Sequence, residues 1–193
     1  MTNQRRIDEQ EKGLRDEGGE RGVIVHHDGD GGSLRAERVI IAIPPKLVPE
    51  IRFEPQLQGR RAELMKSMPM GAVIKHTAVY DKPFWRDEGL SGMVVSDTGP
   101  IHVVFDNSLP DGEHGILIGF SEAKEARKLA SLREDERRDA AVACFTRYFG
   151  DRAQKPVAYV DHVWEHDPWS GGCYGAFMPP GVWTKLGTSI REP

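Results

Sequence analysis

The sequence contains few cysteines and no long apolar run, and each absence excludes a class of protein. Its 193 residues include 2 cysteines, too few for the disulfide framework of a small secreted domain. No apolar stretch approaches the roughly 20 residues of a membrane-spanning helix, and the amino terminus lacks the apolar core of a secretion signal. We therefore expect no membrane segment in this chain and a cytoplasmic location.

The chain also lacks an excess of positive charge. Lysines and arginines total 26 against 30 aspartates and glutamates, a formal net charge of −4. Proteins that attract nucleic acid or anionic membranes usually display a basic surface, so we expect no nucleic-acid partner. The 38% of hydrophobic residues is typical of a globular core. Nothing in the composition indicates an oligomeric state.

A third absence concerns nucleotide binding. The glycine pattern G-x-G-x-x-G places a tight turn and a helix amino terminus against a pyrophosphate. This pattern does not occur in the sequence. The 193 residues therefore contain no recognisable phosphate-binding turn for a dinucleotide.

Hydrophobic periodicity predicts strands first, then helices, then a final strand. Apolar alternation and continuous apolar runs indicate a short edge strand at 5–8 and strands at 23–26, 38–43, 70–80, 90–96, 101–105, 115–120 and 157–164. Helical spacing indicates helices at 58–68, 121–130 and 131–150. This order predicts an α+β fold with a mixed, largely antiparallel sheet and flanking helices.

Two local patterns refine this prediction. Glycines and aspartates at 28–33 predict a turn that joins the strands at 23–26 and 38–43 into a hairpin. The second of these strands is apolar throughout, which is typical of a strand buried on both faces. Ser131 and Glu134 have the spacing of a capping box at the start of the last helix.

Lys75 is the first candidate for chemistry. In the predicted strand it shares a face with Val73, Thr77 and Val79, because side chains alternate along a strand. A lysine is costly to bury, so either its amine serves an active site or its stem covers apolar surface while the amine reaches water. The residues themselves leave both alternatives open.

Residues 164–184 form a loop rich in aromatics. They include five aromatic side chains, Cys173, and the adjacent glycines Gly171 and Gly172, which permit positive φ. Aromatic residues on such a loop face either a flat ligand or the neighbouring core. Without further information, Cys173 reads as a small buried hydrophobe.

Four motifs occur in the order and spacing of one enzyme family. They are Arg-Val-Ile-Ile-Ala-Ile-Pro-Pro at 38–45, Met-Pro-Met-Gly-Ala-Val-Ile-Lys at 68–75, Tyr-Asp-Lys-Pro-Phe-Trp-Arg at 80–86, and Trp164 followed by Ser-Gly-Gly-Cys-Tyr at 170–174 and Pro-Pro-Gly at 179–181. Over residues 38–193 the chain therefore resembles the flavin-dependent monoamine oxidases. The resemblance implies FAD as cofactor and a small-molecule amine as substrate.

The resemblance also implies how the chain is divided. The family carries its phosphate-binding segment nearer the amino terminus and a second flavin-contacting segment after the Pro-Pro-Gly motif. We expect this chain to be an internal piece of such an enzyme, inactive by itself. The implied division is a partial FAD-binding domain at 1–48, a substrate-binding domain at 49–165 and a return segment into the FAD-binding domain at 166–193.

Four residues match family positions around the flavin. Lys75 would hold a water against the flavin N5 and assist the reaction with dioxygen. Trp164 would border the flavin, and Tyr174 would form one wall of an aromatic cage around the amine. Cys173 matches the cysteine that bonds to the flavin 8α-methyl in animal enzymes, a bond that not all bacterial relatives make.

Two further residues, Phe120 and Val103, match positions that line the substrate cavity. Val103 is aliphatic where some relatives carry tyrosine, so the resemblance does not specify which amine is oxidised. The implied reaction is oxidative deamination, with dioxygen as acceptor, giving imine and then aldehyde, ammonia and hydrogen peroxide. A polyamine oxidase or an L-amino-acid oxidase of the same superfamily is the alternative.

Other classes of function fit less well. His162, His166 and Cys173 offer zinc-ligand chemistry, but a spacing of four does not converge on a strand, and we expect no metal. Cys173 as the nucleophile of a hydrolase has no local signature behind it. A cofactor-free module that binds a partner through the aromatic loop stays open as an alternative.

Overall fold

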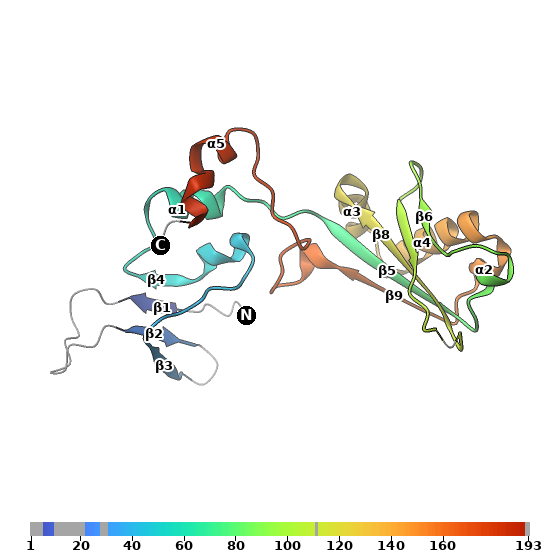
Figure 1. The fold of residues 1–193 in the computed structure, drawn as a ribbon, viewed down its shortest axis with the longest axis horizontal. Coiled ribbons are helices and arrows are strands. Elements are labelled where there is room, and N and C mark those ends of the chain that lie inside the picture. The colour runs from blue at the N-terminus through green and yellow to red at the C-terminus, as the bar shows by residue number, and fades with distance from the viewer. Residues whose placement is uncertain (1–5, 10–21, 28–30, 111, 192–193) are drawn as a thin grey trace. The chain divides into compact units, whose positions relative to one another are not determined.

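The computed structural model describes residues 6–9, 22–27, 31–110 and 112–191, and it divides into two compact units (Figure 1). The first unit contains the chain up to Met70, together with Trp169–Gly171 and Gly175–Pro193. The second contains Gly71–Pro168 and Gly172–Tyr174. The amino-terminal and carboxy-terminal parts of the first unit are therefore connected along the chain by the residues of the second.

The first unit is built on a four-stranded sheet of order β3-β2-β1-β4. The pairings of β1 with β2 and of β2 with β3 are antiparallel, and that of β1 with β4 is parallel. Its elements are β1 (Arg6–Glu9), β2 (Val23–His26), β3 (Ser33–Ala36), η1 (Pro45–Glu50), β4 (Arg52–Glu54), α1 (Gly59–Lys66), α5 (Val182–Leu186) and η4 (Gly187–Arg191).

A small apolar cluster holds the helices of this unit together. Leu64 of α1 is fully buried and clusters with Met68 and with Leu186 at the end of α5. Met178 and Val182 pack against these three residues. The predicted helix at 58–68 is confirmed, because its apolar side faces this cluster.

Two sequence-based predictions fail in the first unit. The short strand near the amino terminus is not at an edge, because β1 lies between β2 and β4. The hairpin pairs β2 with β3, and residues 38–43 form no strand; Ile40 is 91% exposed. A strand buried on both faces needs neighbours on both sides, and no described strand pairs with residues 38–43.

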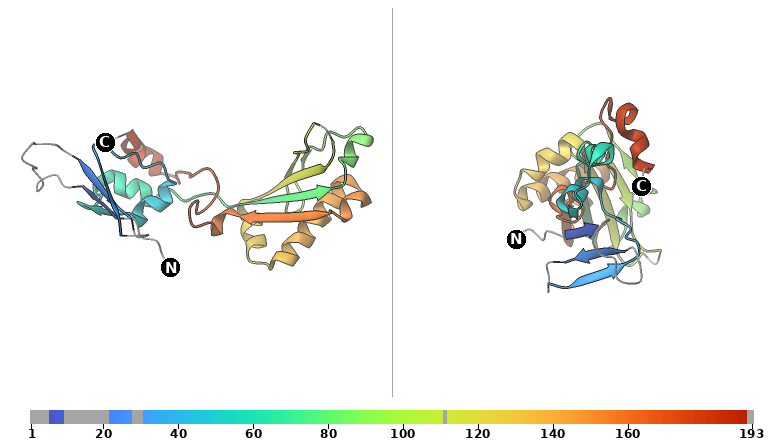
Figure 2. Two further views of the ribbon diagram at one scale, coloured as in Figure 1. Left: turned by 90° about the horizontal axis from the view of Figure 1, so that it is seen from below. Right: turned by 90° about the vertical axis from the view of Figure 1, so that its left-hand side faces the viewer.

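The second unit is built on a five-stranded, fully antiparallel sheet of order β6-β7-β8-β5-β9. Helices α3 and α4 lie against one face of it (Figure 2). Its elements are β5 (Val73–Tyr80), α2 (Phe84–Asp87), β6 (Val94–Val95), β7 (Val103–Asp106), β8 (Gly115–Glu122), α3 (Ala123–Ala130), α4 (Glu134–Phe149), η2 (Asp151–Gln154), β9 (Ala158–Val163) and η3 (Trp164–His166).

The covered face of this sheet follows the predicted alternation. Along β5, Ile74 and Ala78 are fully buried and face the helices. Phe145 of α4 packs so closely on β8 that a Cβ at Gly119 would lie 3.2 Å from its ring. The predicted α+β class with a largely antiparallel sheet and flanking helices is therefore confirmed.

A buried polar network crosses the covered face. The hydroxyl of Tyr159 donates to Asp161 at 3.3 Å, so it accepts from Nδ1 of His76 at 2.8 Å, and Nε2 of His76 accepts from Ser121 at 2.9 Å. Burial lowers the pKa of His76 to about 4. Arg137 of α4 binds both oxygens of Asp161 at 3.0 Å. The network therefore ties α4 to three strands.

Element ends in the second unit differ from their predictions. β8 continues to Glu122, which places Ser121 in a strand, and β6 contains Val94–Val95 alone of the predicted 90–96. The predicted capping box is wrong, because the hydroxyl of Ser131 donates to Lys128 and closes α3. The carboxylate of Glu136 instead accepts from the amide of Arg133, the N-cap residue that precedes α4, at 3.0 Å.

Residues 49–70 pack with the first compact unit. The predicted domains at 1–48, 49–165 and 166–193 stay a prediction. The assignment of flavin binding and amine binding to particular segments stays a prediction. Within the described residues, no helix is long and apolar enough to cross a membrane.

Candidate functional site

Three of the residues selected from the sequence lie in one row across the second sheet. Phe120 of β8 is directly opposite Val103 of β7 on one side and Lys75 of β5 on the other. His162 of β9 is directly opposite Lys75 and extends the row. Directly opposed residues of antiparallel strands share a face, with Cβ atoms about 5 Å apart. We refer to Val103, Phe120, Lys75 and His162 as the Lys75 row.

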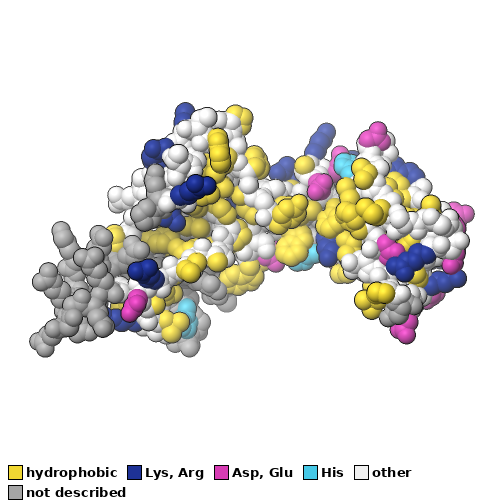
Figure 3. Space-filling model, viewed as in Figure 1, with side chains coloured by type: hydrophobic (Ala, Val, Ile, Leu, Met, Phe, Trp, Pro, Cys, Tyr) yellow, Lys and Arg dark blue, Asp and Glu magenta, His cyan; other side chains and the backbone are white. Residues whose placement is uncertain are grey.

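The row lies on the face of the sheet that the helices leave open. Lys75, Phe120 and Val103 are half-buried. Apolar neighbours on this face are strongly exposed, with Val95 at 86% and Val160 at 62%. Figure 3 shows hydrophobic side chains gathered over the strands of this unit. Contiguous exposed apolar areas are typical of surfaces that bind a ligand or another protein.

Lys75 carries an amine on this face, beside the polar side chains of Thr77 and His162 and the apolar ones of Phe120 and Val103. Among the described residues, none forms a hydrogen bond or ion pair with its amine. A half-buried amine among apolar side chains is unfavourable unless water or a ligand satisfies it. Among the described residues, no buried side-chain nitrogen or oxygen lacks a hydrogen-bond partner, so the amine of Lys75 reaches the surface. The structure is therefore compatible with both alternatives that the sequence left open, an amine that serves an active site and one that reaches water.

Trp164 lies at the end of the row, where β9 passes into η3. Its ring centroid is 4.4 Å from that of His162, at an interplanar angle of 70°. The Nε2 of His162 lies 3.7 Å from a carboxylate oxygen of Asp167. The structure therefore connects Trp164 to the Lys75 row through His162.

Cys173 is tied to the start of β5 by its backbone. Its amide donates to the carbonyl of Gly71 at 2.7 Å. Gly171 and Gly172 both have positive φ, at 61° and 153°, so the chain turns here as the two glycines predicted. The Cys173 thiol is free and half-buried. The side chain is therefore only partly buried, whereas the residue type alone suggested a small buried hydrophobe.

Tyr174 is the candidate that the described residues support least. Its side chain is 98% exposed, so no described neighbour covers the ring. The structure brings Lys75, Phe120 and Val103 together and links Trp164 to them. It places Cys173 and Tyr174 beside the entry to β5 by backbone contact. The roles of all six residues stay predictions.

His162 was missed by the sequence reasoning, which considered it only as a zinc ligand. Pairing the alternation of the last predicted strand with that of residues 70–80 would have placed it on the Lys75 face, but the register between strands cannot be read from either strand alone. Within the described part of the chain, no group of three His, Cys, Asp or Glu side chains could hold a metal ion.

The chemistry of the row suits a flat, conjugated ligand. Phe120 and Val103 offer apolar contact, Trp164 offers a ring, and Lys75 offers hydrogen-bond donors without a competing partner. A flavin ring is planar and largely apolar and becomes more electron-rich when reduced, so a neighbouring lysine amine complements it. The residues present therefore fit a flavin placed against this face.

Comparison with known sequences agrees with this chemistry. A family model described as flavin containing amine oxidoreductase matches residues 6–193. The chain is 42% identical over 172 residues to a putative flavin-containing monoamine oxidase AofH of Mycobacterium tuberculosis, covering 89% of this chain and 37% of that protein. It is 37% identical over 164 residues to a probable flavin-containing monoamine oxidase A of Dictyostelium discoideum, covering 85% and 36%.

Solved structures of two amine-oxidising enzymes are similar to the chain. Putrescine oxidase, in its wild-type form bound to putrescine, has a TM-score of 0.87 at 31% identity, over 97% of this chain and 40% of that one. Cyclohexylamine oxidase from Brevibacterium oxydans IH-35A has a TM-score of 0.85 at 30% identity, over 97% and 39%. The chain therefore spans well under half the length of the proteins that it matches.

Proposed function

The chain belongs to the family of flavin-containing amine oxidoreductases, and from this premise we propose that it supplies the amine-facing sheet of an FAD-dependent amine oxidase. The observation that carries the proposal is the Lys75 row, in which a half-buried lysine stands between Phe120 and His162 on an open sheet face, with no partner for its amine among the described residues. The substrate is a small-molecule amine.

The bound cofactor supplies the redox chemistry. When bound, FAD would supply the two-electron chemistry that converts the amine to an imine with dioxygen as acceptor, so that the products would be hydrogen peroxide and, after hydrolysis of the imine, aldehyde and ammonia. The protein contributes binding, orientation and electrostatics, and these contributions belong to particular side chains of the open face.

Lys75 serves the half-reaction with dioxygen. Its amine would donate a hydrogen bond to a water held against the flavin. A cationic donor stabilises the negative charge that develops as dioxygen is reduced, and it does so most strongly where bulk water is displaced. Half-burial of Lys75 among apolar side chains provides such a setting.

The aromatic and aliphatic residues orient the amine. Phe120 and Val103 form the apolar lining beside Lys75 and exclude water from the reacting carbon. Tyr174 flanks the nitrogen, and its 98% exposed ring is available to a ligand. An apolar aromatic surface beside the nitrogen disfavours protonation of the amine and so favours the neutral amine, the form that gives up hydride. Trp164 borders the flavin ring.

Cys173 is the candidate for covalent attachment of FAD. Its thiol is free and half-buried, and it lies in the Ser-Gly-Gly-Cys-Tyr motif that resembles the family's attachment site. The proposed bond joins the thiol sulfur to the flavin 8α-methyl. Catalysis by the Lys75 row does not depend on this bond.

A diamine is the second candidate substrate, because one of the similar structures is a putrescine oxidase bound to putrescine. An L-amino acid is less well supported. Its carboxylate calls for an arginine, whereas the Lys75 row carries a lysine and a histidine among apolar residues. Relative rates with a monoamine, a diamine and an amino acid separate the three substrates.

We further propose that the chain is part of a longer protein, because it spans well under half the length of the relatives that it matches. The test of the proposed function uses that longer protein. We expect a flavin absorbance band at about 450 nm, a property of the cofactor, and peroxide release on addition of amines. A colourless protein that leaves amines unchanged would contradict the proposal and favour the cofactor-free interaction module.

A further inference from the structure

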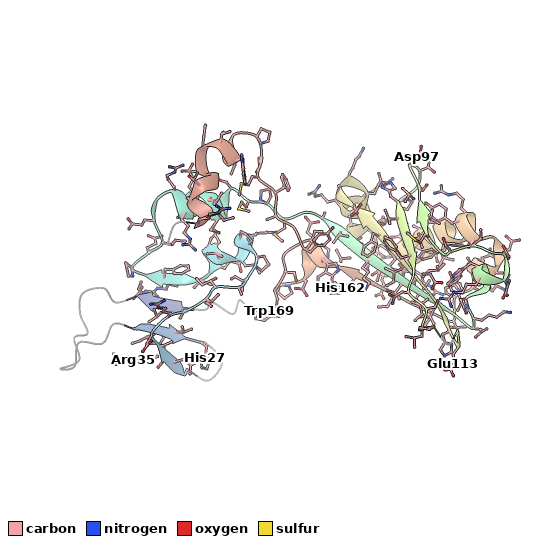
Figure 4. The ribbon with its side chains drawn as sticks, viewed as in Figure 1. His27, Arg35, Asp97, Glu113, His162 and Trp169 are labelled. Atoms are coloured by element: carbon pink, nitrogen blue, oxygen red, sulfur yellow. The ribbon has the colours of Figure 1, made fainter. Side chains whose placement is uncertain are left out.

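His162 occupies a place in the site that no role yet explains. It stands directly opposite Lys75 across β9 and β5, so their side chains are neighbours on the open face. Figure 4 labels His162 among the side chains of the second unit. Lys75 is therefore flanked by Phe120 on the β8 side and by His162 on the β9 side. The His162 side chain is 50% exposed, so burial in the core does not account for its orientation.

Two contacts fix the His162 ring. It meets the Trp164 ring edge-to-face, with centroids 4.4 Å apart and planes at 70°. Its Nε2 lies 3.7 Å from a carboxylate oxygen of Asp167, which is 21% exposed. The chain turns at η3 (Trp164–His166), so that Trp164, its first residue, and Asp167, the residue after it, both lie near the imidazole of His162.

Neither contact is strong by itself, because exposed ion pairs and single ring pairs contribute little. Together they hold the imidazole from two directions. The edge of the imidazole then holds the Trp164 ring in one orientation. Trp164 begins a short 3-10 helix, so its side chain is not oriented by strand pairing. Without the imidazole, the described ring contact of Trp164 is lost.

We propose that His162 is a positioning residue of the amine-oxidising site: held by Asp167, it fixes the Trp164 ring beside Lys75. The inference rests on the proposed function, because the orientation of Trp164 affects the reaction only if a flavin lies against this face. Small displacements of groups that line a reacting centre reduce the rate by up to about 100-fold.

The test follows Trp164 directly, in the longer protein labelled with 5-fluorotryptophan. Fluorine NMR reports the surroundings of each ring, and a Trp164→Phe variant identifies the resonance of Trp164. The variants are His162→Ala, His162→Phe, which keeps a ring in contact with Trp164, and His166→Ala, a control on the same turn whose side chain is exposed. Each variant is also assayed with amine at steady state.

We expect His162→Ala to shift the Trp164 resonance and to lower kcat about tenfold with little change in KM, because the loss falls on positioning at the reacting centre and not on substrate affinity. His162→Phe should keep the Trp164 resonance and kcat close to their wild-type values, and His166→Ala should change neither of these two quantities. An unshifted Trp164 resonance in His162→Ala overturns the inference.

A shifted resonance with unchanged kcat also overturns the inference, because the contact would then exist without serving the reaction. Failure of the proposed function looks different. A wild-type protein that binds no flavin and oxidises no amine would contradict that function, and the fluorine spectra would show separately whether His162 holds the Trp164 ring.

Discussion

Lys75 of β5 lies directly opposite Phe120 of β8, on the face of the sheet that α3 and α4 leave open. The next residue of each strand, His76 and Ser121, points the other way and joins the buried polar network. The same strands therefore present, on one face, a lysine amine that has no hydrogen-bond partner among the described residues, and on the other a buried imidazole bonded through both nitrogens. The buried network fixes the register that places Lys75 in its row.

The buried imidazole of His76 makes stability depend on pH. Its pKa is lowered to about 4 in the folded protein, chiefly by burial, against an ordinary value of 6.5. The unfolded chain therefore takes up a proton first, and stability present above about pH 6.5 is lost as the pH falls toward 4. Between pH 7 and pH 5 we expect His76 to account for a loss of about 2 kcal/mol.

Urea unfolding of the wild type and of His76→Gln at these two pH values measures this loss. The variant has no imidazole to titrate, so its free energy of unfolding should fall less than that of the wild type over the same interval. Equal pH slopes for the two proteins would show that His76 is not buried in its neutral form.

The ion pair of Arg137 and Asp161 should contribute strongly to stability. The side chain of Asp161 is 4% exposed, so Arg137→Met leaves a buried carboxylate without its partner, which costs about 3 kcal/mol. Arg133→Met is the matched control, because Arg133 pairs with Asp135 at the surface, and loss of an exposed pair costs at most about 1 kcal/mol. Similar unfolding free energies for the two variants would contradict the buried network.

Phe120 should affect substrate preference. Phe120→Ala removes apolar contact that a large side group of the amine would otherwise make, so kcat/KM for an arylalkyl amine should fall about tenfold, and that for methylamine should change little. Leu109→Ala, in the exposed loop after β7, is the control. A uniform loss across both amines would mean that Phe120 supports the sheet without contacting substrate.

Cys173 can be tested separately from the reaction. If the thiol is bonded to FAD, acid precipitation of the longer protein leaves the yellow colour in the pellet, and Cys173→Ala releases it to the supernatant. Cys144→Ala, at the buried cysteine of α4, should leave the colour where the wild type has it. Colour in the wild-type supernatant would exclude the bond.

Alternation predicted the two faces of β5 correctly, because a strand covered on one side must alternate. The family resemblance selected Lys75, Phe120 and Val103 separately, and it did not predict that Phe120 is paired directly with both of the others. His162 could not be placed by the same means, since its position depends on the register between β5 and β9. Residues 38–43 were mispredicted because an apolar run shows what a segment can bury, not whether a partner strand is present.

The most direct test of the whole account is the rate at which the reduced flavin of Lys75→Met reacts with dioxygen, measured by stopped flow. We predict that this rate falls at least about 100-fold, while reduction of the flavin by amine under anaerobic conditions changes much less, because the amine of Lys75 acts where charge develops on oxygen. Lys124→Met, an exposed lysine of α3, should change neither rate. An unchanged rate with dioxygen in Lys75→Met would contradict the placement of the flavin against the Lys75 row.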